Sequence, residues 1–389
     1  MRILHTGDWH VGRTIHRRQR LDEARAVLEE IVEIAKRETV DVVLVCGDTY
    51  ETFAPSAEAE RIVYDTLLAL TSGGIPVVLV AGNHDYARRL IAVEDLLEAV
   101  NVHVAAETRR PDEGGVIEIA THTGDQVAQI AVLPWVSERQ LFGAEEMMGL
   151  QEDPHKAYAE HIPSLLEALC AGFDPKKVNL LAGHLFVSGA RPGGGERELT
   201  IGEIFAITPA ALPTTPQYIA LGHVHRPQEA PGAPVPTRYA GSPLQLDFGE
   251  ADQQKSVTIV DVDPGKPARA REVPLSAGRR LIDLHARLEE LETHVGVDED
   301  AYVRVFLECE GPFPGLVERV QEFLPNAVEV RLVYEREDPE RAVADYRTMT
   351  PAQLFSRYYQ QQHGIEPDEH VVQLFNELFE EVSGAAADA

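Results

Sequence analysis

Along the first part of the chain, short apolar runs alternate with segments whose apolar residues recur every three or four positions. The runs at 2–8, 41–48 and 75–85 read "RILHTGD", "DVVLVCGD" and "IPVVLVAGNHD", and they predict strands that are buried on both faces. The segments at 21–38 and 57–70 have the spacing of amphipathic helices. This alternation predicts parallel βαβ units with right-handed crossovers.

Two later segments alternate apolar and polar residues around a Gly-Asp turn. These segments, 115–123 and 126–135, predict a β-hairpin. Four more apolar segments predict further strands, the last two as closing strands of the domain: 178–184, 217–223, 237–250 and 256–263.

The second half of the chain changes character at a segment rich in proline and charge. We expect a first domain, a linker, a small α+β domain and a helical tail, at 1–262, 263–275, 276–336 and 337–389. The periodicity of the small domain predicts a helix, a strand, a helix and a strand at 281–292, 301–309, 314–325 and 327–335.

The tail carries the signals of a helix start. Thr350, Pro351 and Gln353 have the arrangement of a cap, a first-turn proline and a capping box, and Gly364 is expected to end this helix. A second amphipathic helix is expected at 367–384. The two apolar stripes contain Leu354, Phe355, Tyr358 and Tyr359, and Val371, Val372, Leu374, Phe375, Leu378, Phe379 and Val382. Because two short helices are marginal in water, they should dock either on a partner or on the small domain of the same chain.

Charge and cysteine content narrow the function. The 389-residue chain has 35 Lys and Arg against 64 Asp and Glu, a formal net charge of -29, which argues against a nonspecific nucleic-acid coat protein. It does not exclude DNA at a metal site, where cations offset the negative charge. Three scattered cysteines without a CxxC pair, and no visible signal peptide or membrane span, predict a cytoplasmic protein and no membrane partner.

The same two-residue motif recurs at the ends of five predicted strands, where a glycine precedes a side chain that can bind a metal. The pairs are Gly7-Asp8, Gly47-Asp48, Gly82-Asn83, Gly183-His184 and Gly222-His223. Ligands of open α/β sheets bind outside the carboxyl ends of the strands, so these side chains are expected at one edge. His10 and His225 lie two residues beyond a first ligand and could face the same pocket. A single Asp or His at a strand end is usually a turn former or a core group, but five repeats favour a metal site.

The order of these motifs resembles a known superfamily. "GDWH", "GDTYE", "GNHD", "GH" and "GHVH" stand in the order of the calcineurin-like metallophosphoesterase signature. "DWHVGR", "LGHVHRPQ" and "YAGSPLQLDFGE" resemble the SbcD family more closely. The resemblance implies an α/β fold in which a β-sandwich is flanked by helices, followed by a small α+β capping domain and a C-terminal helical pair.

The resemblance also implies a site with two metal ions. Asp8, His10, Asp48 and His225 would hold one ion, and Asp48, Asn83, His184 and His223 the other, with Asp48 bridging both. A mixed set of imidazole, carboxylate and amide ligands suits Mn, Fe or Zn. The usual metal of the family is manganese, so we expect two Mn²⁺ ions per chain.

Next to these ligands stand residues with other implied roles. His84 resembles the family's catalytic histidine, which is not a ligand and stabilises the transition state or protonates the leaving oxygen. Asp85 is expected either to orient that imidazole or to cap the following helix. Archaeal and eukaryotic relatives carry a histidine at the position of Glu51. The role of their histidine is therefore not assigned to Glu51. Glu51 is expected to be a surface residue or a hydrogen-bond acceptor for a ligand.

Two segments near the predicted site have weaker signals. Arg13, Arg17, Arg18 and Arg20 could guide a DNA backbone, or they could simply be the solvated start of a helix. The Gly-rich segment 188–198 lacks the GK[ST] of a phosphate-binding P-loop and is expected to be a mobile loop near His184. With no Walker motif in the chain, any dependence on ATP would come from a partner.

The function implied by the resemblance is that of a Mn-dependent DNA nuclease subunit. Members act as 3′→5′ exonucleases on double-stranded ends and as endonucleases on single strands and hairpins, in DNA repair and recombination. The implied assembly is a homodimer that joins two SbcC ATPase chains, an SbcC2–SbcD2 heterotetramer, with the tail on the SbcC coiled coil. The alternatives are a phosphoesterase acting on phosphoproteins or nucleotides, and a non-catalytic scaffold.

Overall fold

The structure is a computed structural model. It describes residues 1–137, 158–196, 206–296, 299–309, 315–333, 350–363, 366–368, 370–376 and 378. The chain divides into two compact units, Met1–Leu307 with Pro314–Arg331, and Glu308–Phe313 with Leu332–Ala389. Across the described residues, no helix is both long enough and apolar enough to span a membrane.

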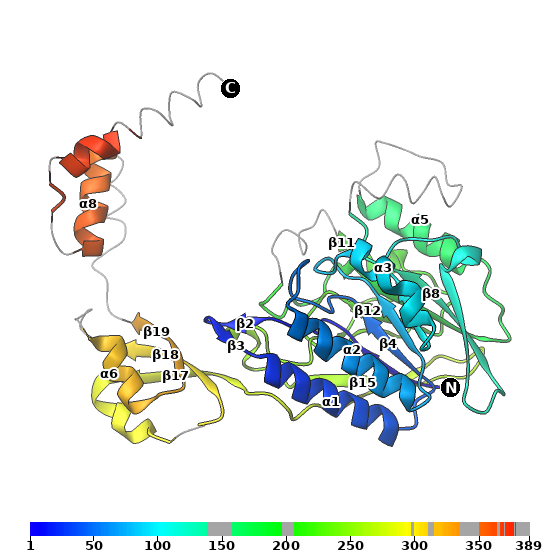
Figure 1. The fold of residues 1–389 in the computed structure, drawn as a ribbon. Coiled ribbons are helices and arrows are strands. Elements are labelled where there is room, and N and C mark those ends of the chain that lie inside the picture. Colours follow the sequence, from blue (N-terminus) through cyan, green and yellow to red (C-terminus); the bar gives the residue numbers. More distant parts are fainter. Residues whose placement is uncertain are drawn as a thin grey trace. The chain divides into compact units, whose positions relative to one another are not determined.

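The first unit contains two six-stranded sheets. The first sheet has the order β16-β15-β1-β4-β5-β6 (Figure 1). Its strands are β1 (Arg2–Thr6), β4 (Val42–Cys46), β5 (Val77–Val80), β6 (Val102–Ala105), β15 (Ser256–Asp261) and β16 (Arg269–Pro274). β1, β4, β5 and β6 are parallel, as the alternation of strands and helices predicts, and β15 and β16 join antiparallel at one edge.

The second sheet has the order β13-β14-β12-β9-β8-β7. Its strands are β7 (Val116–Ala120), β8 (Val127–Leu133), β9 (Val178–His184), β12 (Tyr218–Gly222), β13 (Gln228–Glu229) and β14 (Thr237–Tyr239). The predicted hairpin is the antiparallel pair β7–β8, while β8, β9, β12 and β14 are parallel. A two-residue parallel pair, β10 (Phe186–Val187) with β11 (Ala206–Ile207), lies apart from this sheet.

The two sheets stack with helices on both outer faces (Figure 1). The helices α1 (Leu21–Arg37), α2 (Ala57–Ser72) and α3 (Ala87–Glu98) pack on the first sheet, and α5 (Tyr158–Cys170) packs on the second. Along β4, Val43 packs toward the helices and Leu44 toward the other sheet. A strand covered on both faces must be apolar throughout, which explains the uninterrupted runs. The expected sandwich flanked by helices is confirmed.

One expectation about the sheets was wrong. The strands that end in a glycine and a candidate ligand do not share one sheet edge. β1, β4 and β5 belong to the first sheet, and β9 and β12 to the second. The candidate ligands therefore meet where the carboxyl ends of two stacked sheets come together.

The closing segment and the linker differ from the prediction. Of the expected strand at 237–250 only β14 forms, because Gly241 adopts a φ of 75° and Pro243 cannot donate to a ladder. The segment then runs into a 3₁₀ turn, η4 (Phe248–Glu250). The expected linker 263–275 contains β16, whose charged residues suit a solvated edge strand.

The small domain contains a three-stranded sheet of order β17-β18-β19 and one helix, α6 (Leu316–Phe323). β18 (Tyr302–Glu308), α6 and β19 (Ala327–Val333) agree with the predicted elements. The helix predicted at 281–292 is wrong, because β17 (Leu281–Arg287) is a strand followed by a 3₁₀ turn, η5 (Leu288–His294). Its leucines have helical spacing, but pairing with β18 overrides that local preference.

The second unit contains α8 (Pro351–His363) and a helical stretch at 370–376. The capping box is present, since the Thr350 and Gln353 side chains each accept a hydrogen bond from the other's backbone N–H. The rings of Phe355 and Phe375 stack with centroids 4.3 Å apart. The side chains of Leu354, Tyr358, Leu374 and Leu378 stay exposed, while Phe379 and Val382 lie outside the described residues.

Candidate metal centre

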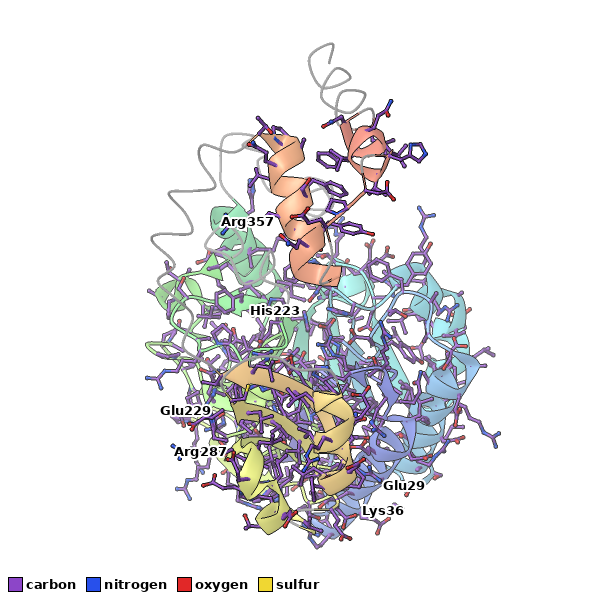
Figure 2. All side chains as sticks on the ribbon, turned by 90° about the vertical axis from the view of Figure 1, so that its left-hand side faces the viewer. Glu29, Lys36, His223, Glu229, Arg287 and Arg357 are labelled. Atoms are coloured by element: carbon purple, nitrogen blue, oxygen red, sulfur yellow. The ribbon has the colours of Figure 1, made fainter. Side chains whose placement is uncertain are left out.

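All seven candidate ligands lie together where the two sheets meet. Six are nearly fully buried: Asp8, His10, Asp48, His184, His223 and His225. The seventh, Asn83, is half-buried. His223 lies among the side chains of the first unit in Figure 2. Polar groups buried this deeply need partners, so each of these side chains is expected to have close polar neighbours.

The backbone at these positions is strained. The φ angles of Asp8, His10, Asp48 and His223 are 49°, 45°, 48° and 101°, a region that L-residues rarely adopt. Glycine permits close approach beside them, because a Cβ on Gly47 would lie 2.1 Å from Nδ1 of His184. Such strain persists where the surrounding structure enforces it, and it is typical of functional sites.

The first group of ligand atoms comes from both sheets. Nε2 of His10 lies 3.1 Å from Nε2 of His225 and 3.5 Å from Oδ2 of Asp48. Nδ1 of His10 donates to Glu51, at 2.9 Å, and Nδ1 of His225 faces Glu250 at 3.1 Å. When each Nδ1 carries its proton toward the carboxylate, Nε2 is the ring atom left to bind a metal.

The second group is built in the same way. Oδ1 of Asn83 lies 3.0 Å from both Nε2 of His184 and Nδ1 of His223, and the two nitrogens are 3.2 Å apart. Nδ1 of His184 donates to the carbonyl of Cys46 at 2.9 Å, which leaves Nε2 as the ring atom that can bind a metal. When these nitrogens carry no proton, their lone pairs repel one another, and a cation between them removes that repulsion.

One carboxylate oxygen connects the two groups. Oδ2 of Asp48 lies 3.5 Å from Nε2 of His10 and 3.5 Å from Nε2 of His184. Its other oxygen, Oδ1, accepts the backbone N–H of His84 at 2.8 Å, which fixes the orientation of the carboxylate. Imidazole, carboxylate and amide donors therefore fit two cations of the transition-metal type, with Asp48 between them.

Asp8 lies in the same cluster and faces a backbone amide. Both of its carboxylate oxygens accept the N–H of His223, at 2.9 and 3.1 Å, and Oδ1 lies 3.9 Å from Nδ1 of His184. Burial raises the pKa of Asp8 to about 7, although His184 and His225 oppose this rise. Burial also opposes ionisation of Asp48, but His184 and His10 hold its pKa well below the usual range.

Two acids hold the histidines, the partly buried Glu51 and the fully buried Glu250, and the sequence offered this role for Glu51 alone. Glu51 contacts His10 and is paired with Arg13 at 2.8 Å. Burial would raise the pKa of Glu51, but His10 and Arg13 lower it to about 2. Of the two roles expected for Glu51, the structure therefore supports that of an acceptor for the ligand His10.

Glu250 is fully buried and lies 2.7 Å from the ammonium of Lys255, which is 5% exposed. Burial would raise the pKa of Glu250, but Lys255 and His225 lower it to about 2. In the sequence, Glu250 appears only as the last residue of "YAGSPLQLDFGE". A buried ion pair produces no periodic pattern, so the sequence does not reveal its role.

The Gly-rich segment also contributes to the site. Glu196 accepts the backbone N–H groups of Gly193, Gly194 and His225 at 2.6, 2.8 and 2.8 Å. The segment was expected near His184, whereas Glu196 contacts the backbone of His225. Residues 197 and 198 of this segment lie outside the described residues.

His84 and Asp85 lie beside the ligands in different ways. Nδ1 of His84 lies 2.7 Å from the carbonyl of Glu51, and its ring stands edge-on to His10 with centroids 4.7 Å apart. Together with His10 and Asp48, His84 offers ligand atoms that all lie within 4.8 Å of one another, so the geometry alone permits a catalytic role or ligation.

Neither expectation for Asp85 holds. Its carboxylate accepts the backbone N–H groups of Thr49, Tyr50 and Gly82 rather than the His84 ring. Tyr86, not Asp85, occupies the cap position of α3. Asp85 instead ties the loop after β4 to the loop after β5.

The four arginines separate into distinct environments. Arg13, Arg17 and Arg18 do not begin a helix, because β2 (Thr14–Ile15) and β3 (Arg18–Gln19) form a hairpin, whereas Arg20 is the N-cap residue of α1. His16 and Arg17 both have positive φ at the turn, the pattern of a type I′ hairpin. Arg17 and Arg18 are exposed, and Arg13 is partly exposed beside Glu51.

Arg20 is a correction to the expected DNA contacts. It is 3% exposed, and its guanidinium donates to Glu23 and to the carbonyl of Gln245. A cation that is buried and already paired is not available to a phosphate. Arg20 instead connects α1 to the segment that follows β14.

Trp135 is a neighbour of the centre that sequence reasoning missed. Its ring stacks on the His223 imidazole, with centroids 5.1 Å apart and planes inclined by 25°. It also lies edge-on to His184 at 6.2 Å. An aromatic residue after a buried strand reads as core in the sequence, so nothing there distinguishes it.

Comparison with known proteins adds the family. Residues 1–227 match the model of the calcineurin-like phosphoesterases, and residues 277–363 match a model described as the Type 5 capsule protein repressor C-terminal domain. The chain is similar to the D subunit of the nuclease SbcCD from Bacillus subtilis, with 33% identity over 97% of each chain. It is also similar to the proteins of the same name from Rhodobacter capsulatus, with 34% identity over 74% of this chain and 72% of the relative, and from Escherichia coli K12, with 28% over 91% and 90%. The chain therefore belongs to the calcineurin-like phosphoesterases, and within them to the SbcD family.

Proposed function

We propose that this chain is a Mn²⁺-dependent DNA nuclease subunit that hydrolyses phosphodiester bonds at the site bridged by Asp48. As a member of the SbcD family it is a metal-dependent nuclease. DNA as substrate, manganese as metal, and action as a 3′→5′ exonuclease and as an endonuclease on single strands and hairpins are the proposed details. The single observation that carries the proposal is that one oxygen of Asp48 lies 3.5 Å from ligand nitrogens of both groups.

The seven ligand residues form two sets that share Asp48. Asp8, His10, Asp48 and His225 would hold one Mn²⁺ ion, and Asp48, Asn83, His184 and His223 would hold the other. When bound, two such ions would supply charge to orient the scissile phosphate and would lower the pKa of a water molecule. The carboxylates of Glu51 and Glu250 orient His10 and His225 and so fix which ring nitrogen faces the site.

His84 is proposed to act on the leaving oxygen rather than to bind metal. Its Nδ1 faces the carbonyl of Glu51 and holds the proton there, so Nε2 is the atom available for exchange with substrate. Its backbone N–H on Asp48 fixes it relative to the bridging carboxylate. A histidine in this position can act as a general acid toward the leaving oxygen.

The DNA backbone is proposed to approach over the β2–β3 hairpin. Arg17 and Arg18 are exposed there, and Val11, between the ligand His10 and the hairpin, is bridged to Tyr50 after β4. Phosphate contacts position a duplex or strand without reading its sequence. This local cation pair compensates for a chain that is otherwise strongly acidic.

The second unit is proposed to bind the coiled coil of SbcC. Each of these relatives is named as the D subunit of the nuclease SbcCD, a name that describes one member of a complex. Supporting this, α8 and residues 370–376 stack Phe355 on Phe375 yet leave Tyr358 and Leu374 61% and 51% exposed. We further propose a homodimer within an SbcC2–SbcD2 heterotetramer in the cytoplasm.

A nuclease assay tests the proposal. The purified chain is incubated with single-stranded and hairpin DNA in Mn²⁺, in Mg²⁺ or with a chelator, and separately with a phosphopeptide and a nucleotide monophosphate. The proposal expects DNA cleavage with Mn²⁺ that the chelator abolishes. Hydrolysis of the phosphopeptide or nucleotide alone would favour another phosphoesterase, and no hydrolysis of any substrate would favour a scaffold.

A further inference from the structure

Two exposed aromatic side chains stand on the loops that carry His84 and its hydrogen-bond partner. Phe53 is 55% exposed on the loop after β4, and Tyr86 is 46% exposed immediately before α3. Their ring centroids are 6.2 Å apart and their planes are inclined by 39°. Large aromatic side chains are rarely left this open on adjacent loops unless they bind something.

Both aromatic residues are fixed close to the catalytic histidine. Phe53 is two residues after Glu51 and Tyr86 is two residues after His84, and two residues span at most about 7 Å. The contact of 2.7 Å between Nδ1 of His84 and the Glu51 carbonyl ties the two loops together. The Asp85 carboxylate ties them again through the Thr49 and Tyr50 amides. The pair is therefore held at the site rather than carried on a free loop.

Tyr86 occupies a position where local structure favours another residue. It is the N-cap of α3, a place preferred by Ser, Thr, Asp and Asn, and its side chain makes no capping hydrogen bond. The helix thus forgoes a stabilising cap in exchange for an exposed ring beside His84. A local rule broken next to an active site indicates a functional demand.

From these observations we infer that Phe53 and Tyr86 form a nucleobase-stacking subsite for the unpaired base next to the scissile phosphate. This inference rests on the proposed nuclease function. Every base offers a π face, so an aromatic pair can hold a single strand without reading its sequence. The subsite would place the phosphate relative to His84 and would explain a preference for unpaired ends and hairpin loops.

A cation that could contact the adjoining phosphate lies close to the pair in the chain. Arg88 is in the first turn of α3, two residues after Tyr86, and its side chain is exposed. Within the described part of the chain it has no salt bridge or side-chain hydrogen bond. Proteins that bind single-stranded nucleic acids combine stacking aromatic side chains with cations for the backbone, and Arg88 supplies an exposed guanidinium on the same segment as Tyr86.

The experiment removes the ring and the base separately. Cleavage of a short single-stranded oligonucleotide in Mn²⁺ is measured for wild type, Phe53→Leu, Tyr86→Leu and the double variant. Each is also tested on oligonucleotides that lack one base at successive positions. Phe53→Tyr, which keeps a ring, and Leu96→Ala, which removes a 72% exposed side chain near the far end of α3, are the comparisons. Mn²⁺ binding by each variant shows whether the centre is intact.

The inference expects KM on intact DNA to rise roughly 5- to 100-fold for each leucine variant, with a smaller change in kcat. The rise in KM should be smaller for Phe53→Tyr than for Phe53→Leu, and the KM of Leu96→Ala should equal that of wild type. In wild type, removing the base next to the cleaved bond should raise KM in the same way. In the double variant, removing that base should add nothing further.

Other results would overturn the inference. These are leucine variants that match wild type, or a penalty for the missing base that persists in the double variant. Loss of self-association without any base-dependent effect would show that the pair is a protein interface instead. If wild type cleaves no oligonucleotide at all, the proposed function itself fails and the inference fails with it.

Discussion

The imidazole of His10 faces that of His225, Nε2 to Nε2 at 3.1 Å, although the two residues are 215 positions apart in the chain. Each ring has its Nδ1 against a carboxylate, that of the partly buried Glu51 for His10 and that of the buried Glu250 for His225. When neither Nε2 carries a proton, their lone pairs point at each other and repel. A cation between the two nitrogens removes that repulsion, so the pair is suited to hold a metal.

Glu250→Gln should weaken the ion held by His225. The amide can no longer fix the imidazole through a charged acceptor, and losing such a partner typically lowers metal affinity about 10- to 100-fold. Calorimetric titration with Mn²⁺ measures the loss. Glu229→Gln is the matched control, because Glu229 is exposed on β13 (Figure 2). Equal Mn²⁺ affinity in wild type and Glu250→Gln would show that Glu250 does not support the site.

Lys255→Met should destabilise the fold. The ammonium of Lys255 donates to Glu250 at 2.7 Å and to the carbonyl of His225 at 2.9 Å, and both groups are buried. Without it the Glu250 carboxylate lacks its cation, which lowers the free energy of unfolding by about 3–5 kcal/mol. Urea denaturation measures this, with the exposed Lys266→Met as control. A variant as stable as wild type would mean that water replaces the ammonium.

His84→Ala should lose turnover and keep both ions. Nδ1 of His84 is engaged by the Glu51 carbonyl, and the other donors of both groups remain. We expect kcat to fall roughly 10²- to 10⁴-fold, the usual contribution of a general acid or base. The Mn²⁺ content of the purified variant is measured beside the exposed control His122→Ala. An ion missing only from His84→Ala would make His84 a ligand.

Arg17→Glu and Arg18→Glu should weaken DNA binding evenly across sequences. Each arginine is exposed on the β2–β3 hairpin, and removing one arginine–phosphate interaction should reduce the slope of log Kd against log salt by about 1. Titration of a labelled oligonucleotide at several salt concentrations gives the slope. Arg61→Glu, on α2 with a side chain 77% exposed, controls for the change in net charge. If the slope of log Kd against log salt were the same in all variants, the β2–β3 hairpin would not contact the DNA backbone.

Tyr358→Glu and Leu374→Glu should prevent co-purification with SbcC while leaving cleavage of single-stranded DNA intact. Both side chains are exposed beside the stacked Phe355–Phe375 pair, so a charge there disrupts a docking face without entering the stack. Gln360→Glu, also exposed on α8, is the control. Truncation after Tyr346 should have the same two effects and also abolish ATP-stimulated exonuclease activity. A truncated chain that still forms the complex at full affinity would place the SbcC contact elsewhere.

Much of the first unit could be predicted because its strands are buried on both faces. β4 alternates between two cores, with Val43 in one and Leu44 in the other, so it is apolar throughout and easily recognised. The glycines before Asp48 and His223 marked the strand ends in the same way. The sequence could not show that these strands belong to two sheets, because a uniformly apolar strand gives no information about which strands pair with it.

The errors fall where long-range contacts override local preference. Leucines in 281–287 have helical spacing, but the segment becomes β17 by pairing with β18. Arg20 looked solvated because its partners, Glu23 and the Gln245 carbonyl, come together only in the folded chain. The role of Glu250 was hidden for the same reason, since it reaches His225 from 25 residues away.

The most direct test of the two-metal account is the Mn²⁺ stoichiometry and nuclease activity of Asp48→Asn beside wild type. Oδ2 of Asp48 lies 3.5 Å from a nitrogen of each group, so a neutral amide there should weaken both ions and abolish cleavage while the fold stays intact. Asp65→Asn, exposed on α2, serves as the control. The account predicts two Mn²⁺ ions and chelator-sensitive cleavage of single-stranded DNA for wild type and the control, and neither for Asp48→Asn. Wild-type cleavage by Asp48→Asn in Mn²⁺ would contradict it.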